Sequence, residues 1–234
     1  MNTIIGLFAK PLGYLLLFFY NIIGNYGITL ILVTVIIKTC LYPLYIKQMK
    51  SSMGTAEITK KTNQLKQKYA NDKETLNKKI AEMYKEEGFN PAGGCLPVLI
   101  QMPILFGMFA LFRTPMEYIS DPEMLYAVHE SFLWIPDLSQ SDKWILPILA
   151  GISTFISFSI SQKNSNAATA DMGGVMKIMR YVFPLMIFLM GRTYSAGLAL
   201  YWFFGQFLQI FFNLHMNTLK KKANDRKKAK GGKK

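Results

Sequence analysis

The chain has 234 residues, 51% of them hydrophobic, and its 27 basic and 14 acidic side chains give it a net charge of +13. It contains several stretches of about 18 or more residues that are almost free of charge, and stretches of that length are typical of membrane spans. These stretches exclude a soluble globular domain and predict an all-α membrane protein.

The N-terminal segment, residues 1–24, has two interpretations. Its apolar part, Leu12 to Ile23, is too short to cross a bilayer, and Lys10–Pro11 interrupts any longer helix. We therefore expect an N-terminal interfacial helix, which lies in the outer membrane interface. A retained sixth span is the alternative, and it leaves the orientation of every later span unchanged.

Five later segments are expected to cross the membrane. The first, second, third and fifth of these segments are long enough by themselves. The fourth has a short apolar part, residues 181–191, which must be extended by residues 176–180. The five expected spans are residues 25–46, 95–113, 144–162, 176–191 and 195–214.

The charges in the connections set the orientation. Residues 47–94 contain ten lysines and the tail contains nine lysines and arginines, whereas the loop after the second span contains six acids and one lysine. Lysine-rich connections stay in the cytoplasm, so the first span runs inward and the C-terminus is cytoplasmic. The expected connections are a cytoplasmic helical hairpin at 47–94, an extracytoplasmic loop at 114–143, a cytoplasmic loop at 163–175 and a basic cytoplasmic tail at 215–234.

Apolar residues recur at helical spacing in the hairpin, from Leu65 in its first helix to Leu76 and Ile80 in its second. The turn between the helices is expected at residues 70–72, with Asn71 capping the second helix. The apolar stripe either forms the seam between the two helices or docks on lipid or a partner, and the sequence leaves both interpretations open.

Lys38 lies inside the first span, 11 residues after Gly27 and therefore about 16 Å along a helix that crosses roughly 30 Å of hydrocarbon. A lysine at that depth costs about 2.5–3.5 kcal/mol on insertion scales. The five expected spans contain no aspartate or glutamate that would pair with it. We therefore expect water or a second molecule to supply its partner. The alternative is a side chain that extends to the inner interface.

Other polar side chains gather at a similar depth, in the inner halves of the spans, whereas the outer halves are almost entirely apolar. Four spans with the same bias predict a hydrophilic, positively charged groove that opens to the cytoplasm and is closed on the outer side. Polar residues also hold membrane helices together, which is the alternative role for any one of them. The candidate groove residues are Lys38, Thr34, Gln101, Ser157, Trp202, Gln206 and Gln209.

Four segments resemble, in this order, the YidC family of membrane protein insertases: GNYGITLILVTVIIKTCLYPL, NPAGGCLPVLIQMPILFGMFALFR, FLWIPDLS and SAGLALYWFFGQFLQI. The resemblance covers residues 21–213. It implies five transmembrane helices around a hydrophilic groove, in a short bacterial plasma-membrane member without a large extracytoplasmic domain. Where the family usually has arginine, this chain has Lys38, which keeps the charge but not the planar group that binds a carboxylate with two hydrogen bonds.

The resemblance implies an insertase: the groove receives the hydrophilic tail of a nascent membrane protein and releases its apolar segment into the lipid bilayer. This insertion would occur alone or beside the general secretion channel. The basic tail would bind the ribosome or anionic lipid. We expect no enzyme activity, no cofactor and no metal site, because the chain has no phosphate-binding loop and no zinc-protease motif. A polytopic transporter or channel is the alternative from another class.

Overall fold

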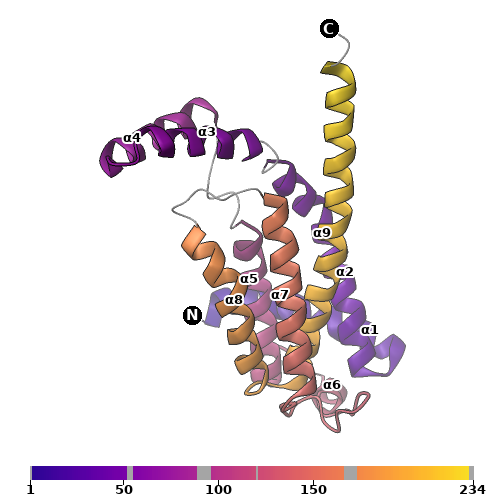
Figure 1. Cartoon of the computed structure of the whole chain (residues 1–234). Coiled ribbons are helices and arrows are strands. Elements are labelled where there is room, and N and C mark those ends of the chain that lie inside the picture. Colours follow the sequence, from indigo (N-terminus) through magenta and orange to yellow (C-terminus); the bar gives the residue numbers. More distant parts are fainter. Residues whose placement is uncertain (1, 52–54, 89–95, 120, 166–172, 232–234) are drawn as a thin grey trace.

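The structure is a computed structural model that describes residues 2–51, 55–88, 96–119, 121–165 and 173–231. Its regular elements are helices, and several are apolar enough to cross a membrane, which confirms the prediction of an all-α membrane protein (Figure 1). In chain order they are α1 (Asn2–Ile23), α2 (Tyr26–Ser51), α3 (Thr55–Lys68), α4 (Lys73–Glu86), α5 (Leu96–Arg113), the 3-10 helix η3 (Pro115–Glu117), α6 (Pro122–Ala127), α7 (Ile145–Ser165), α8 (Gly173–Gly191) and α9 (Ala196–Gly231).

Four of these helices are long and apolar enough to cross a membrane by length and composition: α1, α2, α7 and α9. α5 and α8 contain shorter apolar stretches, Gln101–Arg113 and Ile178–Gly191. This set differs from the five expected spans in that α1 qualifies. The second and fourth expected spans correspond to α5 and α8, which are 18 and 19 residues long. Most of the expected loop at 163–175, and the expected boundary between the hairpin and the second span at residues 94 and 95, lie outside the described residues.

α1 does not break at Pro11. It is a single helix of 22 residues with the proline inside it, so the expected interruption is wrong. A proline in a helix removes one backbone hydrogen bond and crowds the preceding turn, but contacts with neighbouring helices offset that cost. Ala9 and Leu16 of α1 are completely buried. Gly107 lets α5 approach α1 closely, since a Cβ at Gly107 would lie 3.2 Å from the Cβ of Phe8.

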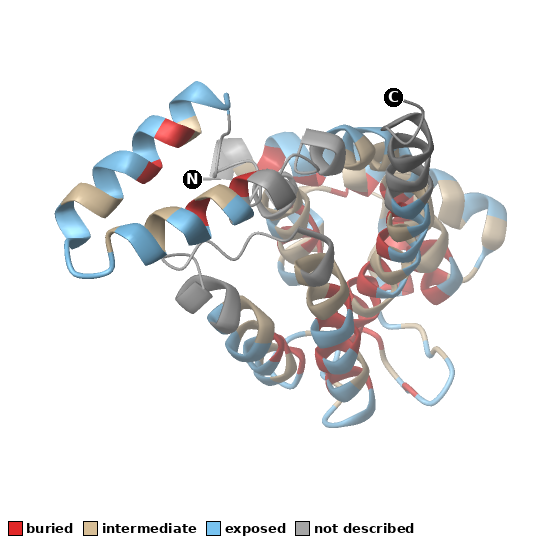
Figure 2. Cartoon of the chain, turned by 45° about the horizontal axis from the view of Figure 1, so that its top comes forward, coloured by how far each residue is buried: buried red, intermediate tan, exposed pale blue. Residues whose placement is uncertain are grey.

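α9 is the central helix of the bundle. α7 packs along it on one side and α2 on another, α8 packs against α7, and α1 packs against α5 and α2. Figure 1 shows α8, α7 and α9 in a row, with the α3–α4 hairpin and the C-terminal part of α9 at the opposite end from α6. In Figure 2 the buried residues gather where the helices of the bundle face one another, as expected for a protein whose outer surface meets lipid.

Two glycines let aromatic rings close against the bundle at the end that carries α6. A Cβ added at Gly27 would lie 2.3 Å from the ring of Phe132, and one at Gly197 would lie 2.4 Å from the ring of Phe112. Distances that short are not possible for real atoms, so these rings pack directly on the glycine backbone. This end of the bundle is therefore closely filled.

We expect Gly27→Ala to destabilise the protein by about 1–3 kcal/mol, because the added methyl group must displace a packed ring. Gly6→Ala is the matched control, since a Cβ at Gly6 would meet no atom closer than 3.6 Å and alanine favours a helix over glycine. Thermal unfolding of both purified variants and the wild type in one detergent measures the difference. If Gly27→Ala unfolds at the same temperature as Gly6→Ala, the ring does not pack as described.

The loop between α5 and α7 is hydrogen-bonded to helices that are distant in the sequence. Glu130 accepts hydrogen bonds from the hydroxyl of Tyr20 in α1 and from the backbone N–H of Tyr26 in α2, the latter at 2.7 Å. The carbonyl of Leu138 accepts a hydrogen bond of 2.9 Å from the N–H of Gly197 at the start of α9. The loop therefore holds the starts of α2 and α9 together.

Asp142 caps the start of α7. Its carboxylate accepts hydrogen bonds from the backbone N–H groups of Trp144, Ile145 and Leu146. Partial burial by itself raises the pKa of Asp142, but these hydrogen bonds stabilise the charged form, and the net pKa lies below its usual value. The sequence analysis did not single out this cap, which fixes where α7 begins.

The hairpin consists of α3 and α4. Asp72, not the expected Asn71, caps α4: its carboxylate accepts hydrogen bonds from the N–H of Thr75 at 3.0 Å and from the Thr75 hydroxyl at 2.6 Å. The expected cap was one residue too early, because an N-cap side chain reaches the N–H three residues later. Ile80 and Met83 of the apolar stripe are buried, which favours the seam between the two helices over a docking surface.

Candidate functional site

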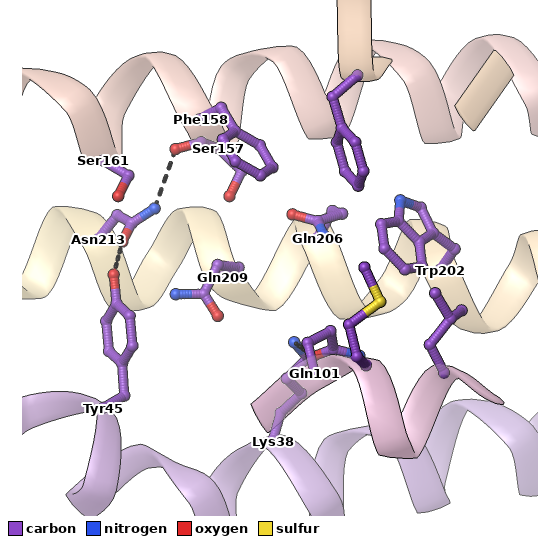
Figure 3. A pocket seen from close by; sticks show the side chains of 13 residues that line it. Lys38, Tyr45, Gln101, Ser157, Phe158, Ser161, Trp202, Gln206, Gln209 and Asn213 are labelled. Atoms are coloured by element: carbon purple, nitrogen blue, oxygen red, sulfur yellow. Dashed lines mark hydrogen bonds between the residues drawn. The ribbon is translucent and has the colours of Figure 1, made fainter. Parts of the chain in front are cut away.

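The bundle contains a polar cavity of about 120 Å³ in the half nearer the hairpin, between α2, α5, α7, α8 and α9 (Figure 3). Polar side chains come from α2, α5, α7 and α9, and apolar ones come mainly from α5, α7 and α8. The lining residues are Lys38, Tyr45, Gln101, Met102, Leu105, Ser157, Phe158, Ser161, Phe183, Trp202, Gln206, Gln209 and Asn213. Six of the seven candidate groove residues are among them.

Among the described residues of this lining, Lys38 alone is charged, and only 9% of it is exposed. Its ammonium donates a hydrogen bond of 2.9 Å to Oε1 of Gln101, and Nε2 of Gln101 donates one of 2.9 Å to the hydroxyl of Tyr201. The expectation that only water or a second molecule would supply a partner is therefore wrong. That expectation rested on the lack of a carboxylate in the spans, whereas a neutral amide accepts the hydrogen bond without cancelling the charge.

The Lys38 ammonium retains donors that the protein does not use. It has three N–H groups, and within the described part of the chain it makes one hydrogen bond and no ion pair. Gly205 of α9 makes room for the side chain, because a Cβ there would lie 3.3 Å from Cε of Lys38. Sequence reasoning missed Gly205 and Tyr201; a glycine between large apolar residues in a span was the available signal.

A second set of contacts joins α2, α7 and α9 at the end of the cavity nearer the hairpin. Asn213 is completely buried; its Nδ2 donates to the carbonyl of Ser157 at 3.1 Å, and its Oδ1 accepts a hydrogen bond from the hydroxyl of Tyr45 (Figure 3). Tyr45 was missed because it lies at the end of the expected span, beside Lys47. Gln206 and Gln209 lie on α9 between Asn213 and Trp202 (Figure 3).

Thr34 does not line the cavity. It is fully buried in α2, and its hydroxyl donates a hydrogen bond of 2.7 Å to the carbonyl of Leu30 in the same helix. This arrangement satisfies the hydroxyl without a ligand.

Trp202 separates the polar cavity from an apolar one. Its indole N–H donates a hydrogen bond of 3.0 Å to the hydroxyl of Thr154, and its ring lies 6.1 Å from that of Phe183. On the other side lies a cavity of about 190 Å³ whose lining is almost wholly apolar; it shares Met102, Leu105, Phe183 and Trp202 with the first. A polar and an apolar cavity thus lie next to each other, with Trp202 between them.

The arrangement offers binding rather than covalent chemistry. Its polar groups are amides, hydroxyls and one ammonium, which can hydrate or bind a polar peptide segment and attract an anionic one. Within the ranges that the structure describes, no cluster of three or more His, Cys, Asp or Glu side chains is placed to hold a metal ion.

Known proteins are similar to this chain over most of its length. A family model described as 60Kd inner membrane protein matches residues 18–224. A protein of Fusobacterium nucleatum subsp. nucleatum named membrane protein insertase YidC is 37% identical over 202 residues, which cover 86% of this chain and 91% of the relative. One of Bacillus anthracis, membrane protein insertase YidC 2, is 37% identical over 87% of this chain and 76% of the relative. One of Geobacter sp. (strain M21) is 34% identical over 91% of this chain but only 37% of the relative.

Proposed function

This chain belongs to the 60Kd inner membrane protein family, the YidC family of membrane protein insertases, and we propose that it inserts nascent membrane proteins into the bacterial plasma membrane. The polar cavity receives the hydrophilic tail of the client, and the client's apolar segment then moves into lipid. The clients and the lipid bilayer are the partners that this activity requires.

The observation that carries the proposal is the set of hydrogen-bonding side chains that line a cavity between apolar helices. A peptide group that enters hydrocarbon without a hydrogen-bond partner costs several kcal/mol. The glutamine, serine and asparagine side chains of the cavity supply such partners, and the unused N–H groups of Lys38 favour a carboxylate. Both effects lower the barrier for a polar tail, and most for an acidic one.

The short apolar stretch of α8 supports release into lipid on that side. Between Arg180 and Arg192 it has 11 residues without charge, which extend about 16 Å, against roughly 30 Å of hydrocarbon. Such a mismatch thins the bilayer locally, so the distance that a tail must cross is shortest beside this helix. The apolar cavity next to α5 and α8 suits the client's apolar segment.

The contacts of α1 support the expected position in the outer interface. A Cβ added at Gly6 would lie 3.6 Å from the ring of Tyr118, and the hydroxyl of Tyr20 donates a hydrogen bond to Glu130. Residues 6 and 20 are about 21 Å apart along the helix, yet both partners belong to the loop at 114–143. A helix that crossed the membrane would have only one of its ends near that loop. We therefore propose that α1 lies along the outer surface.

The C-terminal part of α9 supports a cytoplasmic partner for the basic tail. The helix continues to Gly231, 12 residues beyond Leu219, where its apolar stretch ends, and it therefore extends about 18 Å further. Figure 1 shows this part standing beyond the bundle. Its lysines suit the ribosome or anionic lipid, and the general secretion channel is a further partner that the family membership suggests.

Reconstitution tests the function directly. We expect purified protein in liposomes to insert a single-span client with a short acidic tail several times more efficiently than liposomes without protein, scored by protection of the client's far end from protease. Equal insertion with and without the protein, for this client and for one with a neutral tail, would refute the insertase. An ion current through the purified protein under those conditions would favour a transporter or channel.

A further inference from the structure

Two buried polar atoms outside the polar cavity have no hydrogen-bond partner in the described part of the chain. They are Oγ of Ser159 and Nε of Arg180, the two such side-chain atoms found in the described part of the chain. A buried polar group without a partner is costly, and a charged one more so. Each therefore points to a partner that the described part of this chain does not supply.

Both atoms belong to the seam where α7 and α8 pack together. The Arg180 guanidinium lies 5.6 Å from the ring centroid of Phe155 on α7 and 5.5 Å from that of Tyr181, and these two rings are 5.8 Å apart. Ser159 follows Phe155 by four residues and is therefore one turn away on the same face of α7. The two unpaired groups thus share one surface position.

Neither residue is part of the lining of the polar cavity. The groove is lined by Ser157 and Ser161 of α7, which a helix directs to the side opposite Ser159. Around Arg180 the apolar side chains are exposed, with 57% of Tyr181 and 54% of Val182 accessible. An exposed apolar surface of this kind on a membrane helix is a surface for lipid.

The depth of the position is that of lipid headgroups. Ser159 precedes Lys163 of α7 by four residues, and Arg180 follows Lys177 of α8 by three. Both residues are therefore within about 6 Å, along the helix, of a lysine that ends the charge-free segment on the side nearer the hairpin. This step rests on the membrane topology proposed above and not on the activity of the groove.

No carboxylate of these helices competes for the arginine. Neither α7 nor α8 contains an aspartate or glutamate in its described residues, and there the guanidinium makes only ring contacts and no ion pair. A guanidinium binds phosphate oxygens with two parallel hydrogen bonds, and a serine hydroxyl adds a third donor. Arg180 as a whole is half-buried, so a rotation of its long side chain brings Nε to a phosphate at the surface.

We propose that Arg180 and Ser159 bind the phosphate of a phospholipid in the inner leaflet, whose acyl chains lie along the apolar face of α7 and α8. An anionic phospholipid binds more tightly than a zwitterionic one, because its net negative charge is not offset by a headgroup amine. The site holds a structural lipid at the side of the bundle and is separate from the client groove.

Native mass spectrometry of the detergent-solubilised protein, titrated with phosphatidylglycerol or phosphatidylcholine, tests the site. We expect Arg180→Gln to bind phosphatidylglycerol about tenfold more weakly than wild type, and Ser159→Ala to bind it a few-fold more weakly. The matched control is Arg192→Gln, at the other end of α8, where the guanidinium lies 4.3 Å from the ring of Trp144. This control should bind the lipid like wild type.

Three results would overturn the proposal. Wild-type affinity in Arg180→Gln would remove the arginine from the site, and an equal loss in Arg192→Gln would mean a general charge effect. Displacement of phosphatidylglycerol by excess inorganic phosphate would assign the site to free phosphate instead of lipid. Circular dichroism checks that each variant is folded, and Arg180→Lys, which keeps the charge, should bind between wild type and Arg180→Gln.

Discussion

Replacement of Lys38 by methionine should lower the insertion of a client with an acidic tail about tenfold or more, and at the same time make the protein more stable. The loss of insertion follows from the unused N–H groups of the ammonium in the polar cavity. A charged hydrogen bond contributes about 1.5–3 kcal/mol, which corresponds to at least a tenfold change. A client with a neutral tail should lose less.

The gain in stability follows from the burial of the same charge. Only 9% of Lys38 is exposed, and its partner Gln101 is neutral. Replacing a buried charge by an apolar side chain of similar volume is often neutral or stabilising by about 1–4 kcal/mol. A fold that merely needed Lys38 would show the opposite effect, so the two readouts together separate a functional lysine from a structural one.

Liposome insertion and thermal unfolding, measured on the same preparations, check this prediction. Lys38→Arg should retain most of the activity, because it keeps the charge. Lys47→Met is the matched control: it removes an exposed lysine from the same helix and should change neither readout. If Lys38→Met inserts the acidic-tail client as well as wild type does, the lysine has no part in the mechanism.

Replacement of Trp202 by alanine should destabilise the protein by about 3–5 kcal/mol, the usual cost of truncating a buried aromatic side chain. Only 7% of Trp202 is exposed, and its ring forms the wall between the polar and apolar cavities. Without it the two cavities become one. Insertion should fall as well, because the polar cavity loses the wall that Trp202 forms.

Three comparisons make the Trp202→Ala result specific. Trp202→Phe keeps a ring and loses only the hydrogen bond to Thr154, so it should cost about 1 kcal/mol from that bond. Tyr126→Ala, in α6 where the side chain is 79% exposed, should change thermal unfolding little. Added indole should raise the unfolding temperature of Trp202→Ala alone, since an apolar cavity binds a small aromatic molecule. A Trp202→Ala protein as stable as wild type would show that this residue does not divide the cavities.

The sequence predicted an all-α membrane protein and a shared location for most of the candidate polar residues, because both depend on local pattern. Hydrophobic length fixes where a helix can cross a membrane, and helical spacing fixes which side chains share a face. Lys38, Gln101 and Gln206 were identified on that basis, and the structure brings them to one cavity. Whether the cavity binds clients stays a prediction.

The errors concern partners that no local pattern specifies. The bond from Lys38 to Gln101 joins residues 63 positions apart, and the one from Tyr45 to Asn213 joins residues 168 apart. Such pairs depend on how helices are packed, which periodicity does not reveal. The continuity of α1 through Pro11 has the same origin, since contacts with α5 offset what the proline removes.

The short apolar stretch of α8 has a consequence for the biogenesis of this protein itself. Its 11 charge-free residues, 181 to 191, gain less free energy on entering hydrocarbon than the 18 charge-free residues of α7, 145 to 162, do. α7 is made just before α8, and Gly151 of α7 allows close contact, since a Cβ there would lie 3.3 Å from Cβ of Phe188. The two helices therefore favour entry as a pair during synthesis, in which the stronger segment carries the weaker one across.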